Sequence, residues 1–156
     1  MYRFMLRIIY VLFVCSVVTC PGRAAVAQYL FKDASGHEIN FAHYKGRWII
    51  INYWAVWCGS CWAEVPELNA FYQAHKKQVA LFAVNYDHPP ARTAVFYARK
   101  LSIQFPILID DPRELFHIGE ITALPTTILI DPDGKVRQVL VGEQTKKDLE
   151  RAIGLL

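Results

Sequence analysis

Two cysteines separated by two residues, Cys58 and Cys61, are the side chains of this 156-residue chain best suited to chemistry. A thiolate is the nucleophile in disulfide exchange, so a close pair of cysteines can attack a disulfide and then resolve the product. A bond between them would close a loop too short to stabilise a fold, so the pair indicates reactivity. The other two cysteines, Cys15 and Cys20, lie in an apolar N-terminal segment.

The cysteine pair lies where a predicted buried strand meets a predicted helix. Residues 48–54 (WIIINYW) are β-branched and aromatic, which is typical of a strand buried on both faces. Residues 58–76 have apolar side chains at helical spacing. A cysteine at a helix N-terminus faces free backbone N–H groups and the positive end of the helix dipole, which favour the thiolate. We therefore expect Cys58 to attack, Cys61 to resolve the mixed disulfide, and Gly59 to let a partner chain approach.

Hydrophobic periodicity and turn residues predict the elements that must position this pair. Strands alternate with helices, and a hairpin plus a helix closes the chain. That order predicts an α/β domain with a central mixed sheet covered by helices on both faces. In the helix over 91–101 we expect Val95 and Phe96 on the buried side. The other expected elements are two short strands within 28–40, strands at 79–86, 105–109, 126–131 and 136–141, a short helix at 111–116 and a helix at 145–155.

The sequence around the cysteines resembles the active-site signature of the thioredoxin superfamily. The likeness runs from Asn52 to Cys61 (NYWAVWCGSC) and continues to Pro66, where thioredoxins carry a helix-kinking proline. It covers residues 28–156 and implies a thioredoxin-like fold with an N-terminal β-hairpin extension. Residues 87–118 resemble the central helix–strand insertion of the TlpA/ResA/DsbE branch, whose members are membrane-associated extracytoplasmic thioredoxins.

Two polar residues near the cysteines also resemble that branch. Asn52 occupies the position where cytoplasmic thioredoxins have a buried aspartate, and an amide cannot accept a proton at neutral pH. Glu64 stands where ResA-like proteins carry an active-site glutamate, on the same helix face as Cys61. A partly buried carboxyl group there can have a raised pKa and move a proton to or from Cys61. The alternative for Glu64 is an ordinary solvated helix residue.

The resemblance also assigns residues that contact substrate. Leu124-Pro125 resembles the loop where the superfamily places a cis-proline beside the dithiol, and a backbone edge there can pair with an extended substrate segment. Trp62 departs from relatives, which more often carry a basic or polar residue after the second cysteine. It is either a docking residue for a protein partner or a partly buried surface aromatic. The expected substrate-binding residues are Trp57, Gly59, Ser60, Leu124 and Pro125.

Residues 1–27 have the features of a secretory signal peptide. Basic residues precede the apolar stretch 8–20, and small residues precede Gln28, the expected first residue of a thioredoxin-like domain at 28–156. A helix over 8–20 would reach about 20 Å, short of the roughly 30 Å hydrocarbon core. An uncleaved membrane anchor is the main alternative, and a lipoprotein modified at Cys20 is another.

The charge pattern argues against nucleic acid as a partner. The formal charge of +3 arises from three arginines within residues 1–27, and the rest of the chain is balanced and lacks a Lys/Arg run. A closed zinc site needs four ligands, whereas residues 28–156 hold one cysteine pair and no paired histidine spacing. We therefore expect neither a metal nor another cofactor. A copper-delivery protein remains as a different class, with His117 as the only candidate ligand near the expected site.

The leading hypothesis is a periplasmic or extracytoplasmic thiol–disulfide reductase acting on disulfide-bonded exported proteins. The resemblance implies a membrane thiol donor of the DsbD or CcdA type and apocytochrome c as one favoured substrate. The Gly59-Ser60 dipeptide does not settle the redox poise, so a disulfide oxidase or isomerase remains the alternative. A monomer is expected, because the predicted sheet needs no partner to complete it.

Overall fold

The computed structural model describes residues 30–156, so the expected export signal at 1–27 lies outside the described residues. Within the described range, no helix is both long enough and apolar enough to cross a bilayer. The strands are β1 (Leu30–Lys32), β2 (Glu38–Asn40), β3 (Trp48–Trp54), β4 (Val79–Asn85), β5 (Ile107–Leu108), β6 (Thr126–Ile130) and β7 (Val136–Val141). The helices are the 3-10 helix η1 (Phe41–Tyr44) and the α-helices α1 (Gly59–His75), α2 (Ala91–Lys100) and α3 (Lys146–Ala152).

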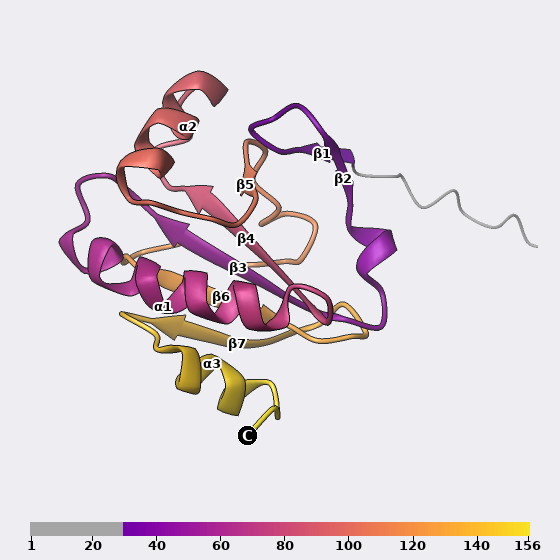
Figure 1. Cartoon of the computed structure of the whole chain (residues 1–156). Coiled ribbons are helices and arrows are strands. Elements are labelled where there is room, and N and C mark those ends of the chain that lie inside the picture. The colour runs from indigo at the N-terminus through magenta and orange to yellow at the C-terminus, as the bar shows by residue number, and fades with distance from the viewer. Residues whose placement is uncertain (1–29) are drawn as a thin grey trace, which may run out of the picture.

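A five-stranded mixed sheet in the order β5-β4-β3-β6-β7 forms the centre of the domain (Figure 1). β3 lies in the middle, parallel to β4 and antiparallel to β6. Both faces of β3 are covered, which explains why its sequence is continuously apolar or aromatic rather than alternating. The predicted thioredoxin-like fold with an N-terminal strand pair is confirmed.

The two faces of the sheet are covered by different kinds of structure. All three α-helices bury side chains in one core cluster, to which α1 contributes Leu68 and Phe71, α2 contributes Ala98, and α3 contributes Leu149. The opposite face is covered by the β1–β2 hairpin, the 3-10 helix η1 and the segment that leads to β6. Helices were expected on both faces, but on this second face the only helix among the described residues is the single turn of η1.

The strand predicted at 105–109 is reduced to the two residues of β5, at the edge of the sheet. Pro106 has no N–H to donate to a strand ladder. Beyond the strand, the N–H of Ile109 bonds the carbonyl of Lys32 at 2.8 Å, and the N–H of Ala34 bonds the carbonyl of Ile107 at 2.8 Å. The hairpin therefore covers the sheet edge that β5 would otherwise leave open.

The short helix predicted at 111–116 is wrong, because residues 112–117 form a series of turns. One helical bond is present, from the N–H of Phe116 to the carbonyl of Pro112 at 3.3 Å. The next N–H groups bond other carbonyls, and His117 adopts a left-handed conformation with φ 53° that stops helical propagation. A single turn has too few bonds to offset the cost of helix nucleation.

The helix predicted over 91–101 is confirmed as α2, but its buried side was predicted wrongly. Ala94 and Ala98 are buried against the sheet, whereas Val95 is half-buried and Phe96 is 54% exposed. Small side chains at 94 and 98 let the helix backbone approach the sheet closely. The larger apolar residues are thereby turned outward.

The C-terminal helix is shorter than the predicted 145–155. Thr145 caps its first turn in a reciprocal capping box with Asp148. Gly154, with φ 74°, ends it, and the N–H of Leu155 returns to the carbonyl of Glu150 at 2.8 Å. The cap at Thr145 determines where the β7–α3 loop, which reaches the candidate site, must end.

Candidate active site

Cys58 and Cys61 form a disulfide at the start of α1, with their Cα atoms 5.3 Å apart. Cys58 is the N-cap residue of the helix, and its Sγ accepts a hydrogen bond from the N–H of Cys61 at 3.2 Å. Both cysteines are buried, 5% and 1% exposed, and they belong to the core cluster under the helices. The expected placement at a helix N-terminus is confirmed. Gly59 is exposed and Ser60 half-exposed, with the Ser60 Oγ 3.5 Å from the Cys58 Sγ.

Exposed aromatic side chains surround this dithiol. Trp57, immediately before Cys58, is 63% exposed, and its indole N–H donates to the Asp87 carboxylate at 2.9 Å. Tyr86 lies edge-on to the Trp57 ring with centroids 6.4 Å apart. Trp62 is 43% exposed, and its indole N–H bonds the carbonyl of Val56 at 3.0 Å. Trp62 therefore has a surface position and also ties the first turn of α1 to the loop before Cys58.

Glu64 is buried, with 2% of its surface exposed. One carboxyl oxygen accepts a bond from the side-chain amide of Asn52 at 3.0 Å, and the other accepts one from the backbone N–H of Gln144 at 3.1 Å. Burial raises the pKa of Glu64 to about 7, and the hydrogen bonds oppose that rise only in part. The alternative of a solvated glutamate is wrong, and the expected raised pKa is supported.

Asn52 links Glu64 to the neighbouring strand. Its amide nitrogen also donates to the hydroxyl of Thr127 on β6 at 3.0 Å. All three side chains are buried, so the carboxyl group is held between two strands and a helix without a cation among its described neighbours. A buried carboxyl group without a counter-ion stays protonated at higher pH than a paired one.

The peptide bond Leu124-Pro125 is cis, as the resemblance implied. β3 and β6 are antiparallel and pair Tyr53 with Thr126, so the end of β3 that leads to the dithiol lies beside the loop before β6. The carbonyl of Pro125 accepts the N–H of Gly142 at 2.8 Å. Because Gln144 follows two residues later and bonds Glu64, the β7–α3 loop joins the cis-proline loop to the buried carboxyl group.

Several contacts of the site have no signal in the sequence. Gln144 reaches Glu64 through its backbone, so its side-chain type gives no indication of the contact. Thr127 and Asp87 reach the site only because β6 begins, and β4 ends, beside the end of β3 that leads to the dithiol. His117, the candidate ligand for a copper protein, lines a hollow with Asp111, Arg113 and other residues of the segment 111–120.

Comparisons with known proteins agree with this geometry. Residues 21–139 match the model of the AhpC/TSA family. The chain is 37% identical to the thiol-disulfide oxidoreductase ResA of Geobacillus kaustophilus over 125 residues, which cover 80% of this chain and 71% of that protein.

Two solved structures show the same likeness. StoA from Bacillus subtilis superposes with a TM-score of 0.64 and 28% identity, covering 79% of this chain and 93% of StoA. A thioredoxin family thiol:disulfide interchange protein from Chlorobium tepidum superposes with a TM-score of 0.65 and 26% identity, covering 81% of this chain and 91% of that protein. Because the family match spans most of the chain and the paired cysteines lie at the N-terminus of α1, the chain belongs to the AhpC/TSA family and is a thioredoxin-fold thiol–disulfide oxidoreductase.

Proposed function

We propose that this chain reduces disulfides in exported proteins, with Cys58 as the attacking thiol, Cys61 as the resolving thiol and Glu64 as the proton carrier. The observation that carries the proposal is the burial of Cys61 and Glu64, one helical turn apart at the N-terminus of α1. A thiol enclosed in that position needs a neighbouring base to become nucleophilic, and water does not reach it freely.

In the first step, the Cys58 thiolate attacks one sulfur of the substrate disulfide. A Cys58–substrate disulfide forms, the substrate S–S bond breaks, and the other substrate sulfur leaves as a thiolate. The N–H of Cys61 and the helix dipole stabilise the charge on the Cys58 Sγ before the attack.

In the second step, Glu64 in its ionised form takes the proton of the Cys61 thiol. The Cys61 thiolate then attacks the Cys58 Sγ, and the substrate leaves with both cysteines reduced. The protein keeps the Cys58–Cys61 disulfide, so two electrons have passed to the substrate. A base with a pKa near 7 is suited to this task, since at neutral pH it is partly ionised and accepts protons readily.

The substrate segment binds against the cis-proline loop and the exposed aromatic rim. The backbone at Leu124 offers an edge for an extended chain, and Pro125 closes the loop beside the dithiol. Trp57 supplies an exposed apolar face, while Gly59 and Ser60 leave room for the substrate backbone.

Export places this chemistry outside the cytoplasm. Residues 1–27 act as a secretory signal, or as an anchor if they are not cleaved, and residues 28–156 work as a monomeric domain. Re-reduction of Cys58–Cys61 then falls to a membrane thiol donor of the DsbD or CcdA type. Apocytochrome c cysteines before haem attachment are the favoured substrate. These assignments rest on the N-terminal sequence and on the likeness to the TlpA/ResA/DsbE branch.

Acid-quenched thiol trapping in the native cells tests the proposal. A Cys58–Cys61 pair found mostly reduced supports a reductase fed by a donor, and a pair found mostly oxidised refutes that direction. A Cys61→Ala variant should hold substrates on Cys58 as mixed disulfides that can be identified. A Cys58→Ala variant is the matched control, because it retains one site cysteine but lacks the attacking one.

A disulfide oxidase or isomerase is the second candidate. The hydrogen bond from the Cys61 N–H to the Cys58 Sγ favours it, because stabilising the thiolate stabilises the reduced protein and makes the disulfide more oxidising. A mostly oxidised pair in cells, with folding intermediates of exported proteins among the trapped partners, would select this candidate.

A further inference from the structure

The outer face of α2 is apolar and basic, and it is open to solvent. Arg92, Val95, Phe96 and Arg99 line a hollow of about 400 Å³ on this face. Their spacing of three, four and seven residues is the pattern by which a helix normally buries one side. In α2 the buried side is instead the one that carries Ala94 and Ala98. Figure 1 shows α2 at the periphery of the molecule.

The cations of α2 lack anionic partners among the described residues. The helix carries Arg92, Arg99 and Lys100 but no Asp or Glu, and none of the three forms an ion pair with a carboxylate of residues 30–156. Residues 1–29 contain no acidic side chain. Lys100 instead lies over the ring of Phe96, with its Nζ 4.8 Å from the centroid. The positive charge on this face is therefore left for an external partner.

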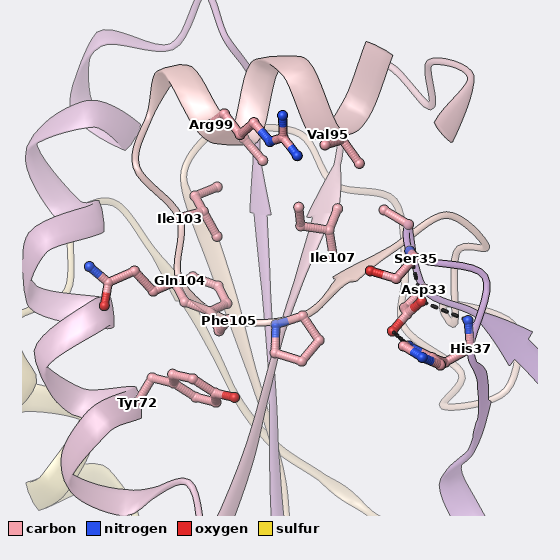
Figure 2. Close-up of a pocket in the computed structure, with 13 residues that line it drawn as sticks. Asp33, Ser35, His37, Tyr72, Val95, Arg99, Ile103, Gln104, Phe105 and Ile107 are labelled. Carbon is pink, nitrogen blue, oxygen red and sulfur yellow. Dashed lines mark hydrogen bonds and ion pairs between the residues drawn. The ribbon is translucent and has the colours of Figure 1, made fainter. Parts of the chain in front are cut away.

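Arg99 also borders a second hollow, of about 440 Å³, on the side of α2 that faces the β1–β2 turn. Figure 2 shows Arg99 and Val95 on α2 above this hollow, with Asp33, Ser35 and His37 from the turn on its far side. Asp33 is the one acidic residue in its lining, and its carboxylate bonds the imidazole of His37 at 3.1 Å and two backbone N–H groups of its own turn. The Asp33 carboxylate is therefore already hydrogen-bonded within its own turn.

From this arrangement we propose that the outer face of α2 docks an acidic segment of the protein partner, with an apolar side chain between two carboxylates. Arg92 and Arg99 are seven residues apart, which separates them by about 10 Å along the helix. An extended chain rises roughly 3.3 Å per residue, so carboxylates three positions apart span the same distance. The apolar side chain between them enters the hollow beside Val95 and Phe96. The hollow favours a side chain over a flat membrane surface as the occupant.

The position of α2 connects its outer face to the dithiol. This part of the inference rests on the proposed function. α2 begins shortly after Tyr86 and Asp87, which contact Trp57 next to Cys58. A partner chain that lies along α2 therefore leads toward the rim of the dithiol. The bound segment raises the local concentration of the partner's disulfide, so it increases the rate of capture rather than the reactivity of Cys58.

The test uses the reduced full chain in a non-ionic detergent and three disulfides. Two are peptides with the same disulfide and the same Gly/Ser linker, one ending in Glu-Leu-Gly-Glu and the other in Lys-Leu-Gly-Lys. The third is a small uncharged disulfide. We expect the acidic peptide to react about tenfold faster than the basic one at low ionic strength, and high salt to reduce that ratio.

Charge reversal on α2 should remove this preference. The Arg92→Glu/Arg99→Glu variant should lose the tenfold ratio and keep its rate with the small disulfide. Lys45→Glu/Lys135→Glu is the matched control, since it makes the same charge change at exposed residues outside α2. Phe96→Ala should slow the acidic peptide only when that peptide carries leucine rather than glycine between its carboxylates.

The possible failures are distinguishable. Equal rates for the two peptides, or equal effects of the α2 and control variants, would overturn the docking proposal while the small disulfide still reacts. Sedimentation with phosphatidylglycerol vesicles that requires Arg92 and Arg99, together with equal peptide rates, would replace the peptide by a lipid surface and also overturn it. No reaction with any of the three disulfides would refute the proposed function itself.

Discussion

Asn52 and Tyr53 are neighbours on β3, yet their side chains enter opposite faces of the sheet and meet carboxyl groups in opposite circumstances. Asn52 bonds Glu64, which is buried without a cation among its described neighbours. The hydroxyl of Tyr53 donates to Asp111 at 2.9 Å, and Asp111 is also paired with Arg113 and lies 3.5 Å from His88.

The comparison separates two uses of a carboxyl group, one buried without a cation and one partly buried beside a cation. Around Glu64, desolvation dominates, and the pKa rises to about 7, where a proton can be exchanged at neutral pH. Asp111 is only partly buried and is paired with Arg113, and the pKa of Tyr53 is raised far above its usual range by its own burial and then by Asp111. The first arrangement is suited to moving protons, and the second holds the segment 111–120 against the sheet.

The largest expected difference between the two faces of the sheet concerns the rate of disulfide exchange. Glu64→Gln removes the proton acceptor but keeps the volume, so resolution of the mixed disulfide at pH 7 should slow by about 10²-fold. Stopped-flow measurement of substrate release from Cys58 checks this. At pH 5 the wild-type carboxyl group is mostly protonated, and the two rates should converge. A slow variant at both pH values would point to a structural defect instead.

The second prediction concerns stability against pH. The pKa of Glu64 is near 7 in the folded protein and about 4.5 when unfolded, so the folded state binds one more proton between these values. The stabilisation is complete below pH 4.5 and is lost as the pH rises through 7, up to about 3 kcal/mol.

Urea denaturation at pH 5 and pH 8 measures this effect. The wild type should lose more stability over that interval than Glu64→Gln, which has no carboxyl group to titrate. An equal loss in both proteins would show that Glu64 has an ordinary pKa.

On the other face, Asp111→Ala should affect stability and leave the chemistry unchanged. The change leaves the buried hydroxyl of Tyr53 without an acceptor, which costs about 2 kcal/mol in the free energy of unfolding. Adding Tyr53→Phe should recover part of that loss, because the unpaired hydroxyl is then gone. The rate of disulfide exchange at pH 7 is the control. If that rate falls as it does in Glu64→Gln, the distinction between the two faces is wrong.

The smallest expected effect comes from Asn52. Its amide bond to Glu64 lowers the carboxyl pKa, so Asn52→Ala should move the pH dependence of the resolving step to higher pH. Thr127→Val should move the profile in the same direction, since the hydrogen bond of the Thr127 side chain also lowers the pKa of Glu64. A pH profile that does not move in Asn52→Ala would mean that Asn52 does not tune Glu64.

The sequence predicted the elements nearest the dithiol well. The bounds of β3, α1 and β4 fall within one residue of the expected ranges, because each has a long run with one clear period. Prediction from the sequence failed where the segments are short. The two-residue β5 is bonded to a residue far away in the chain, through the N–H of Ala34 and the carbonyl of Ile107, and the turns at 112–117 have too few helical bonds to offset helix nucleation.

The face of α2 was also misjudged for a reason that lies outside local sequence. Periodicity gives the angle between residues on a helix but not which side meets the sheet. Ala94 and Ala98 are the buried residues of α2, and Ala98 packs in the core cluster under the α-helices, where only a small side chain allows the helix to approach closely. That close approach leaves Phe96 in solvent.

The sequence by itself determined the pair Cys58 and Cys61, their place between a buried strand and a helix, and the α/β class, because these follow from residue type and local period. Only the tertiary structure decided that Glu64 is buried between Asn52 and Gln144, that the cis-proline loop joins the same network, and that the cations of α2 form no ion pair with a carboxylate of residues 30–156. Burial and charge pairing are properties of the space around a side chain. That space is filled by segments up to 80 residues away, as in the bond from Gln144 to Glu64.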